Sequence, residues 1–185
     1  MPKLLRRTQF GNPILRTLTK ELSKKEITSS DIQHLIQNMR HTLKNRKFGV
    51  GLAATQVGKS VAVAIIGIKP TPNRPDVEPF ESIIINPSFE GVGEKNDEWE
   101  ACISFSARGE GMYAKVPRYR KIIASWADEK GVIHREQLEG LPSQVFQHET
   151  DHLKGVLFVD RVVDSKSWMT ASEYRKQIVL PKLKD

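Results

Sequence analysis

Apolar residues recur at helical spacing in one stretch near the start of the chain. They fall at i, i+3, i+4, i+7 and i+11, namely at Ile32, Leu35, Ile36, Met39 and Leu43. This pattern predicts an amphipathic helix of about four turns, and the capping side chains of residues 28–31 mark its start. We interpret it as a scaffold helix that packs on the core. Residues 1–26 are polar and predict irregular structure.

Short apolar runs in the middle of the chain predict strands. Residues 61–66 are apolar, residues 82–86 contain three consecutive isoleucines, and both stretches are typical of buried strands. The proline-rich residues 69–79 between them predict a surface loop. Residues 91–97 predict a turn-rich connection, and the partial alternation of residues 99–105 predicts an extended segment.

A hairpin is predicted further along the chain. Residues 119–126 and 132–138 flank the turn sequence Asp-Glu-Lys-Gly of residues 128–131, which is typical of a short connection between two strands. Residues 106–111 contain two glycines and predict a flexible insertion.

A helical pattern surrounds two histidines, His148 and His152, which flank Glu149 in the motif His-Glu-x-x-His. On a helix this spacing leaves the two rings about 40° apart around the axis and about one turn apart along it. Both rings can then bind one metal ion, and Glu149 is placed to contact a water on that ion. The alternative interpretation is a buried helix that carries two histidines by chance.

The sequence on both sides supports this helix. Residues 140–143 predict its start, with proline tolerated in the first turn, and Gly155 predicts its end. Beyond it, residues 156–159 predict a short strand. A final helix is predicted over residues 164–177, stopped by Pro181.

These elements predict one α+β domain over residues 1–185, in which mixed or antiparallel sheets surround the central metal-binding helix. An N-terminal scaffold helix precedes the metal-binding helix, and a C-terminal helix follows it. The sequence has no secretory signal and no apolar run that could span a membrane. Its single cysteine, Cys102, excludes an internal disulfide and fits a reducing compartment. We therefore expect a cytoplasmic protein without a membrane partner.

The chain is basic, with a net charge of +7 and an isoelectric point near 9.5. This charge fits a polyanionic partner such as a ribosome surface, but solubility alone is the commoner explanation. We expect no DNA partner. Four basic residues lie close to the C-terminus, namely Arg175, Lys176, Lys182 and Lys184.

A catalytic metal ion needs three protein ligands and an open position for water. Two residues compete for the third place. Glu173 lies 21 residues after His152, a plausible spacing for the carboxylate of a zinc peptidase. Cys102 lies in the extended segment close to Glu100, and a thiolate ligand suits Fe²⁺, Zn²⁺, Co²⁺ or Ni²⁺. The residue types favour Cys102 only slightly.

The glycine-rich residues 48–58 form another candidate binding segment. Gly49 and Gly51 permit a positive φ or a close approach to a ligand. The segment lacks the phosphate-loop pattern, so it does not indicate a nucleotide site. Gln56 is either a satisfied buried amide or a donor aimed at a ligand.

Three separated stretches resemble the motifs of peptide deformylases. Residues 49–56 match the family pattern G-x-G-L-A-A-x-Q, and residues 148–152 match H-E-x-D-H. Residues 100–104 match E-G-C-L-S at three of five positions, and residues 11–16 resemble the family's G-x-P-x-L-R. The similarity runs from about residue 8 to residue 165.

This resemblance implies a metallohydrolase that removes the formyl group from the N-terminal formylmethionine of newly made polypeptides and releases formate. It implies that Cys102, His148 and His152 bind the metal and that Glu149 is the general acid and base. The resemblance indicates Fe²⁺, while the ligand types alone also permit Zn²⁺, Ni²⁺ or Co²⁺. It also implies docking near ribosomal RNA.

Further roles follow from the same resemblance. The side-chain amide of Gln56 and the backbone N–H of Ile103 would donate to the developing oxyanion. The backbone around Val50, Gly51 and Ala101 would pair with the substrate as an added strand. An apolar pocket for the methionine side chain would include three residues, Val50, Leu141 and Val145.

The chain departs from the family pattern near the cysteine. Ala101 replaces a glycine, which would cost about 1 kcal/mol if that position needs a positive φ. Ile103 replaces a leucine and keeps its N–H. The loop between Phe105 and Val116 is longer than usual. We expect these departures together to affect substrate range and turnover more than the metal site.

Two other functions remain open on the residues alone. The first is an endopeptidase with Glu173 as the third metal ligand. The second is a protein that binds formylated peptides, other peptides or a ribosome without turnover, which the altered residues 101–103 motivate.

Overall fold

The computed structural model describes residues 1–45, 49–107 and 110–183. Phe48 of the glycine-rich segment, residues 108–109 of the predicted insertion and Lys184 of the basic C-terminus lie outside the described residues. Within the described ranges, no helix combines the length and the apolar character needed to cross a membrane.

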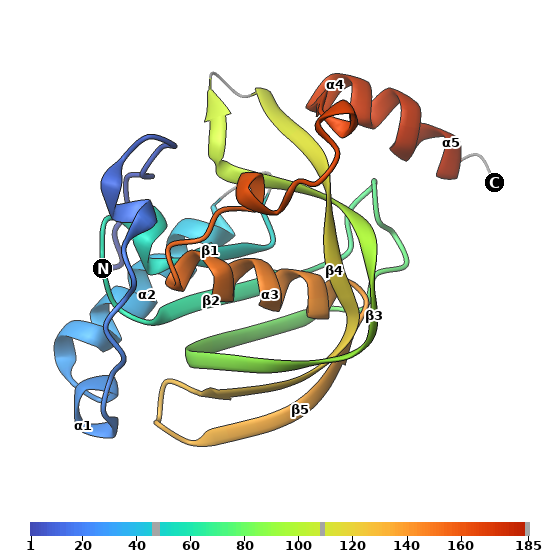
Figure 1. The fold of residues 1–185 in the computed structure, drawn as a ribbon. Helices are drawn as coiled ribbons and strands as arrows, with labels where there is room; N and C mark the ends of the chain where they lie inside the picture. Colours follow the sequence, from blue (N-terminus) through green and yellow to red (C-terminus); the bar gives the residue numbers. More distant parts are fainter. Residues whose placement is uncertain (46–48, 108–109, 184–185) are drawn as a thin grey trace.

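An antiparallel sheet forms the frame of the molecule (Figure 1). Its first five strands are β1 (Gly51–Ala53), β2 (Val63–Ile68), β3 (Phe80–Ala107), β4 (Glu110–Ala127) and β5 (Ile133–Glu139). They lie side by side in the order of the chain, and a sixth strand, β6 (Met169–Thr170), pairs with β4. The predicted hairpin is confirmed, because β4 pairs with β5 across residues 121–139.

The helix that carries the two histidines, α3 (Leu141–Leu153), lies inside the curve of these strands (Figure 1). The predicted scaffold helix is confirmed as α2 (Ser30–Lys44), which buries Ile36, Met39 and Leu43. Shorter helical segments are α1 (Lys24–Ile27), α4 (Ala171–Tyr174) and α5 (Leu180–Lys182). The predicted α+β class, with strands around the helix that carries the two histidines, is therefore confirmed.

Both faces of β2 are buried, which explains its continuous apolar sequence. Val63 and Ile65 pack in a cluster with the apolar face of α2. Ala64 and Ile66 point to the opposite face and pack in a cluster with Phe146 of α3. Because successive side chains of a strand alternate between faces, β2 holds the scaffold helix on one side and the histidine helix on the other.

The prediction of a turn-rich connection over residues 91–97 is wrong. These residues continue β3, which pairs with β4 on both sides of a register shift between Val92 and Lys95. Gly93 has a φ of +77° at this shift. The glycine therefore serves a bulge inside a long strand rather than a turn between two strands. Cross-strand pairing with distant residues overrides the local signal.

Three predictions about the C-terminal part are also wrong. Residues 156–159 do not form a strand, because a 3-10 helix spans Phe158–Arg161. The final helix starts at Ala171 instead of at residue 164, since Asp164 caps only the short turn Ser165–Ser167. Pro181 does not stop the helix. It lies in the first turn of α5, where a missing backbone N–H costs little.

Candidate metal centre and active site

Helix α3 places two imidazole rings on one side of its axis. The helix begins after Gly140, whose φ is +65°, and carries Pro142 in its first turn. His148 and His152 then lie one turn apart, with ring centroids separated by 4.9 Å. The chain turns away after Lys154 at Gly155, whose φ is +72°. The predicted start and end of this helix are confirmed.

Cys102 reaches the same place from strand β3. The pairing of β3 with β4 is regular from Lys95 to Ala101 and resumes at Ser106, so residues 102–105 form an irregular segment. Such an interruption re-aims side chains, as is common beside active sites. The Cys102 Sγ atom lies 3.2 Å from the Nε2 atom of His152.

The three side chains together form a candidate metal-binding group. Ligand atoms of Cys102, His148 and His152 all lie within 4.8 Å of one another. A tetrahedral ion with usual bond lengths would separate its sulfur and nitrogen ligands by about 3.5 Å, close to the observed sulfur–nitrogen distance. Among the described residues, Glu173 does not belong to this group; its carboxylate accepts a hydrogen bond from Gln177 instead.

The charges around the group favour a thiolate. Burial alone would raise the pKa of Cys102, but the charge of His152 and hydrogen bonds from His148 and His152 hold that pKa well below its usual value. The Nδ1 atom of His152 is buried without a hydrogen-bond partner among the described residues. A thiolate and two imidazoles fit a transition-metal ion of the iron, cobalt, nickel or zinc type.

Glu149 lies against the glycine-rich segment. A Cβ atom built on Gly51 would lie 2.7 Å from Glu149 Cδ and 2.9 Å from Glu149 Cγ, too close for a real contact. Gly51 therefore permits a close approach, whereas Gly49 takes a positive φ of +116°. Burial raises the pKa of Glu149 to about 7, despite the nearby charges of His148 and His152. Its Oε2 atom is buried without a hydrogen-bond partner in the described structure.

The side-chain amide of Gln56 is buried, has hydrogen-bond partners, and also points toward the candidate metal-binding group. Its Oε1 atom accepts a hydrogen bond from the N–H of Ala53 at 2.8 Å. This fixes the amide, and its Nε2 atom donates to Cys102 Sγ and Ser104 Oγ, each at 3.3 Å. Ile103 lies beside the same segment, because a Cβ atom on Gly49 would be 3.5 Å from Ile103 Cγ2. The structure thus brings both predicted oxyanion donors close to Cys102.

A buried ionic network supports His148, and the sequence alone did not predict it. Glu100 Oε2 lies 3.0 Å from His148 Nδ1, and both Glu100 oxygens accept hydrogen bonds from Arg118. Arg118 also donates to Asp151, which accepts two further bonds from Arg161. Burial alone would raise the pKa of Glu100, but His148 and Arg118 lower it to about 2.

The signal for Glu100 was present in the sequence. In a strand, side chains two residues apart point to the same face. Glu100 is therefore expected on the same face as Cys102, two residues further along β3. A carboxylate that accepts the second N–H of a metal-binding histidine is common, and it fixes the orientation of the ring. The link from Glu100 to Arg118 and Asp151 could not be found without the pairing of β3 with β4.

The residues predicted to bind the substrate lie in three places: at the edge strand β1, in an apolar cluster, and beside the irregular segment of β3. Gly51 belongs to β1, which is the terminal strand of the sheet order. Val145 is buried, and Val50 and Leu141 are half-buried against the same apolar cluster. Ala101 lies at the last regular pair before the irregular segment. Its φ is not positive, because Asn86 is the only non-glycine residue with a positive φ in the described chain. Ala101 therefore carries no backbone strain from a left-handed conformation.

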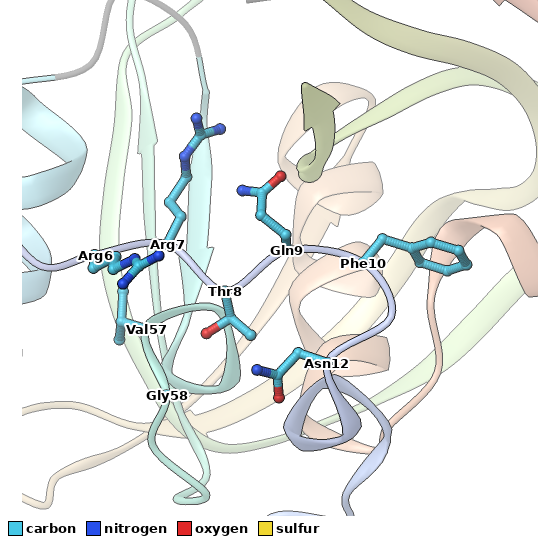
Figure 2. A pocket seen from close by; sticks show the side chains of 8 residues that line it. All are labelled: Arg6, Arg7, Thr8, Gln9, Phe10, Asn12, Val57 and Gly58. Atoms are coloured by element: carbon cyan, nitrogen blue, oxygen red, sulfur yellow. The ribbon is translucent and has the colours of Figure 1, made fainter. Parts of the chain in front are cut away.

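A separate groove of about 520 Å³ runs along the N-terminal segment (Figure 2). Cys102, His148 and His152 are not among the residues that line it. Its lining consists of Arg6, Arg7, Thr8, Gln9, Phe10, Asn12, Val57 and Gly58.

Comparison with known proteins gives a consistent result. The family model of polypeptide deformylase matches residues 5–168. A peptide deformylase of Leptospira biflexa is 39% identical over 163 residues, which cover 85% of this chain and 87% of the relative. Peptide deformylase 2 of Nostoc sp. is 35% identical over 179 residues and covers 96% of both chains.

A solved structure shares the fold. It is the Met-Ala-Ser-bound crystal structure of a class I type b peptide deformylase from Acinetobacter baumannii. The two structures superpose with a TM-score of 0.80 at 30% identity, covering 88% of this chain and all of the other.

Proposed function

Because this chain belongs to the polypeptide deformylase family, we propose that Cys102, His148 and His152 bind the metal ion of its reaction. The chain is a metal-dependent hydrolase that removes the N-terminal formyl group from nascent polypeptides. The observation that carries the assignment of residues is the convergence of one thiol and two imidazoles within 4.8 Å.

A divalent cation in this group would act as a Lewis acid, lowering the pKa of water and polarising the formyl carbonyl. We propose Fe²⁺ as the native ion, from the family resemblance. The thiolate and imidazole ligands support this choice, and they equally accept Zn²⁺, Ni²⁺ or Co²⁺ in purified protein.

Glu149 is the proposed general acid and base. Its carboxylate takes the proton of the attacking water and returns it to the leaving amine, so that formate and a free N-terminus result. A pKa near 7 suits both steps at neutral pH. Gly51 supports this role by leaving the space into which the carboxylate fits.

Gln56 and Ile103 are the proposed donors to the oxyanion that develops on the formyl carbonyl. The Nε2 atom of Gln56 is held 3.3 Å from Cys102 Sγ, and Ile103 directly follows that cysteine. One donor of this kind typically contributes about 3 kcal/mol to the stabilisation of the transition state.

The formylated peptide is proposed to bind as an added strand at the free edge of β1. The terminal position of β1 in the sheet supports this. The backbone of Val50, Gly51 and Ala101 would pair with the peptide. Leu141 and Val145, with Val50, would contact the methionine side chain, since all three pack against one cluster. The Met-Ala-Ser peptide bound to the Acinetobacter baumannii relative begins with methionine, which also supports this pocket.

A cytoplasmic location, a single domain over residues 1–185 and contact with the ribosome remain proposals. The last is supported by the net charge of +7 and by three exposed basic residues of the C-terminal segment, namely Arg175, Lys176 and Lys182. Binding to ribosomes should weaken steeply with added salt if it is electrostatic.

The test combines formate release from a formyl-Met peptide with metal analysis of two variants. We expect Cys102→Ser to lose metal and activity, and Glu173→Gln to keep both. The endopeptidase alternative predicts the reverse metal contents. The non-enzymatic alternative predicts no formate from the metal-loaded wild type, whether it holds Fe²⁺ or Ni²⁺.

A further inference from the structure

The N-terminal strap, defined as residues 7–10, joins the two segments that carry the proposed oxyanion donors. The N–H of Thr8 donates to the carbonyl oxygen of Gln56, and the N–H of Phe10 donates to that of Ser104, each at 2.8 Å. Figure 2 shows Arg7 and Gln9 on one side of the strap and Thr8 on the other.

Arg7 extends from the strap to the segment that follows Cys102. Its Nη1 atom donates to the carbonyl oxygen of Ile103 at 2.6 Å and to Ser106 Oγ at 3.1 Å. Ser106 Oγ in turn donates to the same Ile103 oxygen at 3.1 Å. A guanidinium carries its charge at every working pH, so this carbonyl has a permanent cationic partner.

The carbonyl of Ile103 and the N–H of Ser104 belong to one planar peptide unit. That N–H donates to Cys102 Sγ, at a nitrogen–sulfur distance of 3.4 Å. A cation at the oxygen end of a peptide unit polarises it and strengthens its N–H as a donor, because linked hydrogen bonds reinforce one another. The guanidinium of Arg7 is therefore coupled to the sulfur through a single peptide group.

We propose that Arg7 is a positioning residue that fixes the Ile103–Ser104 peptide and thereby stabilises the electron pairs of the Cys102 sulfur. This inference rests on the proposed role of Cys102 as a metal ligand. Hydrogen bonds to a ligating sulfur tune the electronic properties of the bound ion, and such outer partners commonly change activity or metal affinity tenfold or more. The arginine thus links the start of the chain to the metal centre.

The test uses full-length protein with Co²⁺ in place of the native metal, because a thiolate bound to Co²⁺ gives a charge-transfer band. In Arg7→Met the N–H to sulfur bond weakens, so we expect this band to move to longer wavelength. We also expect kcat/KM for a formyl-Met peptide to fall about tenfold. Arg7→Lys keeps the charge near the carbonyl and should recover part of both changes.

Arg6 provides the matched control. It is the adjacent arginine, its side chain is exposed, and it donates no hydrogen bond to the described residues. Arg6→Met should leave the band and kcat/KM unchanged. If Arg7→Met does not fold, Ser106→Ala replaces it, because this variant removes the second donor to the Ile103 carbonyl and should give a smaller shift in the same direction.

The possible results distinguish the role of Cys102 as a metal ligand from the role of Arg7. A wild-type band that disappears in Cys102→Ser supports the sulfur as ligand, and a wild type without the band refutes that role and this inference with it. An Arg7→Met band at the wild-type position overturns the inference, even if the melting temperature and the activity fall together. A shifted band with normal Arg6→Met behaviour supports it.

Discussion

The carboxylate of Glu149 occupies the space that a side chain on Gly51 would fill. A Cβ atom on Gly51 would lie within 3 Å of Glu149 Cδ and Cγ. No residue larger than glycine therefore fits at position 51 while the Glu149 side chain keeps its place. The glycine comes from an edge strand and the glutamate from the central helix, and about a hundred residues separate them in the sequence. Two motifs that look independent along the chain are therefore one steric unit.

This contact predicts the effect of Gly51→Ala. The added methyl group should displace the Glu149 carboxylate while the metal-binding side chains keep their places. Since general acid–base catalysis typically contributes 10²- to 10⁴-fold, we expect kcat to fall at least about 100-fold with normal metal content, measured by formate release and metal analysis. Gly111→Ala is the control, because among the described residues its Cβ would meet only Ser106 Cβ, at 3.7 Å. Equal losses in the two variants would contradict the steric argument.

Replacing Glu149 itself separates proton transfer from metal binding. Glu149→Gln keeps the size of the side chain and removes its ability to take and return a proton. We expect metal content to remain normal, KM to change little, and kcat to fall about 10²- to 10⁴-fold. Steady-state kinetics of a formyl-Met peptide, with metal analysis of the same samples, measure all three. Near-normal turnover would refute the role of Glu149.

Local pattern predicted α2 and α3 well and the long strand β3 poorly. The apolar spacing of Ile36, Met39 and Leu43 is an intrinsic property of one helix, and it suffices to predict that helix. The error at Gly91 has a different cause. The ring of Tyr119 packs where a Cβ of Gly91 would stand, so this glycine serves a contact with a strand about thirty residues away. The residues around Gly91 in the sequence do not indicate this contact.

The candidate site divides in the same way. The motif of His148 and His152 predicts their common face from helix geometry alone, and the structure confirms that face. The sequence alone did not decide whether Cys102 or Glu173 is the third metal ligand. The resemblance to the deformylase family favoured Cys102. Arg7 was not predicted at all, because its link to Cys102 depends on the path of the N-terminal strap across two other segments.

The network around Glu100 predicts a loss of metal affinity when its charge is removed. In Glu100→Gln, His148 loses the carboxylate that orients its ring, and buried Arg118 loses one of its two anionic partners. We expect metal to bind about 10- to 100-fold more weakly, measured by competition with a chelator. The melting temperature should also fall, because the buried guanidinium is left less well paired.

The control for this variant is Glu94→Gln. Glu94 lies on the same strand and is exposed. Its replacement by glutamine removes the same charge. Metal affinity equal to wild type in Glu94→Gln, with a clear loss in Glu100→Gln, assigns the effect to the network. Unchanged affinity in both variants would remove Glu100 from the support of His148.

The hairpin turn between β4 and β5 gives a prediction about pH. Burial alone would raise the pKa of Asp128, but hydrogen bonds from His134 and from the N–H groups of Val132 and Lys130 lower it. A pKa that is lower in the folded state stabilises the fold above the pKa of the unfolded chain, near 4. This stabilisation is lost as the pH falls through the lower folded-state value.

Asp128→Asn should therefore reduce the free energy of unfolding by about 1 kcal/mol at neutral pH, an amount typical of one partly exposed charged interaction. The difference from wild type should shrink below pH 4, because the wild-type carboxyl then takes up its proton as well. Urea unfolding at a series of pH values measures this difference. Asp97→Asn, on an exposed part of β3, should show no comparable change. A difference that grows as the pH falls would have the wrong sign for a lowered pKa and would contradict the assignment of Asp128.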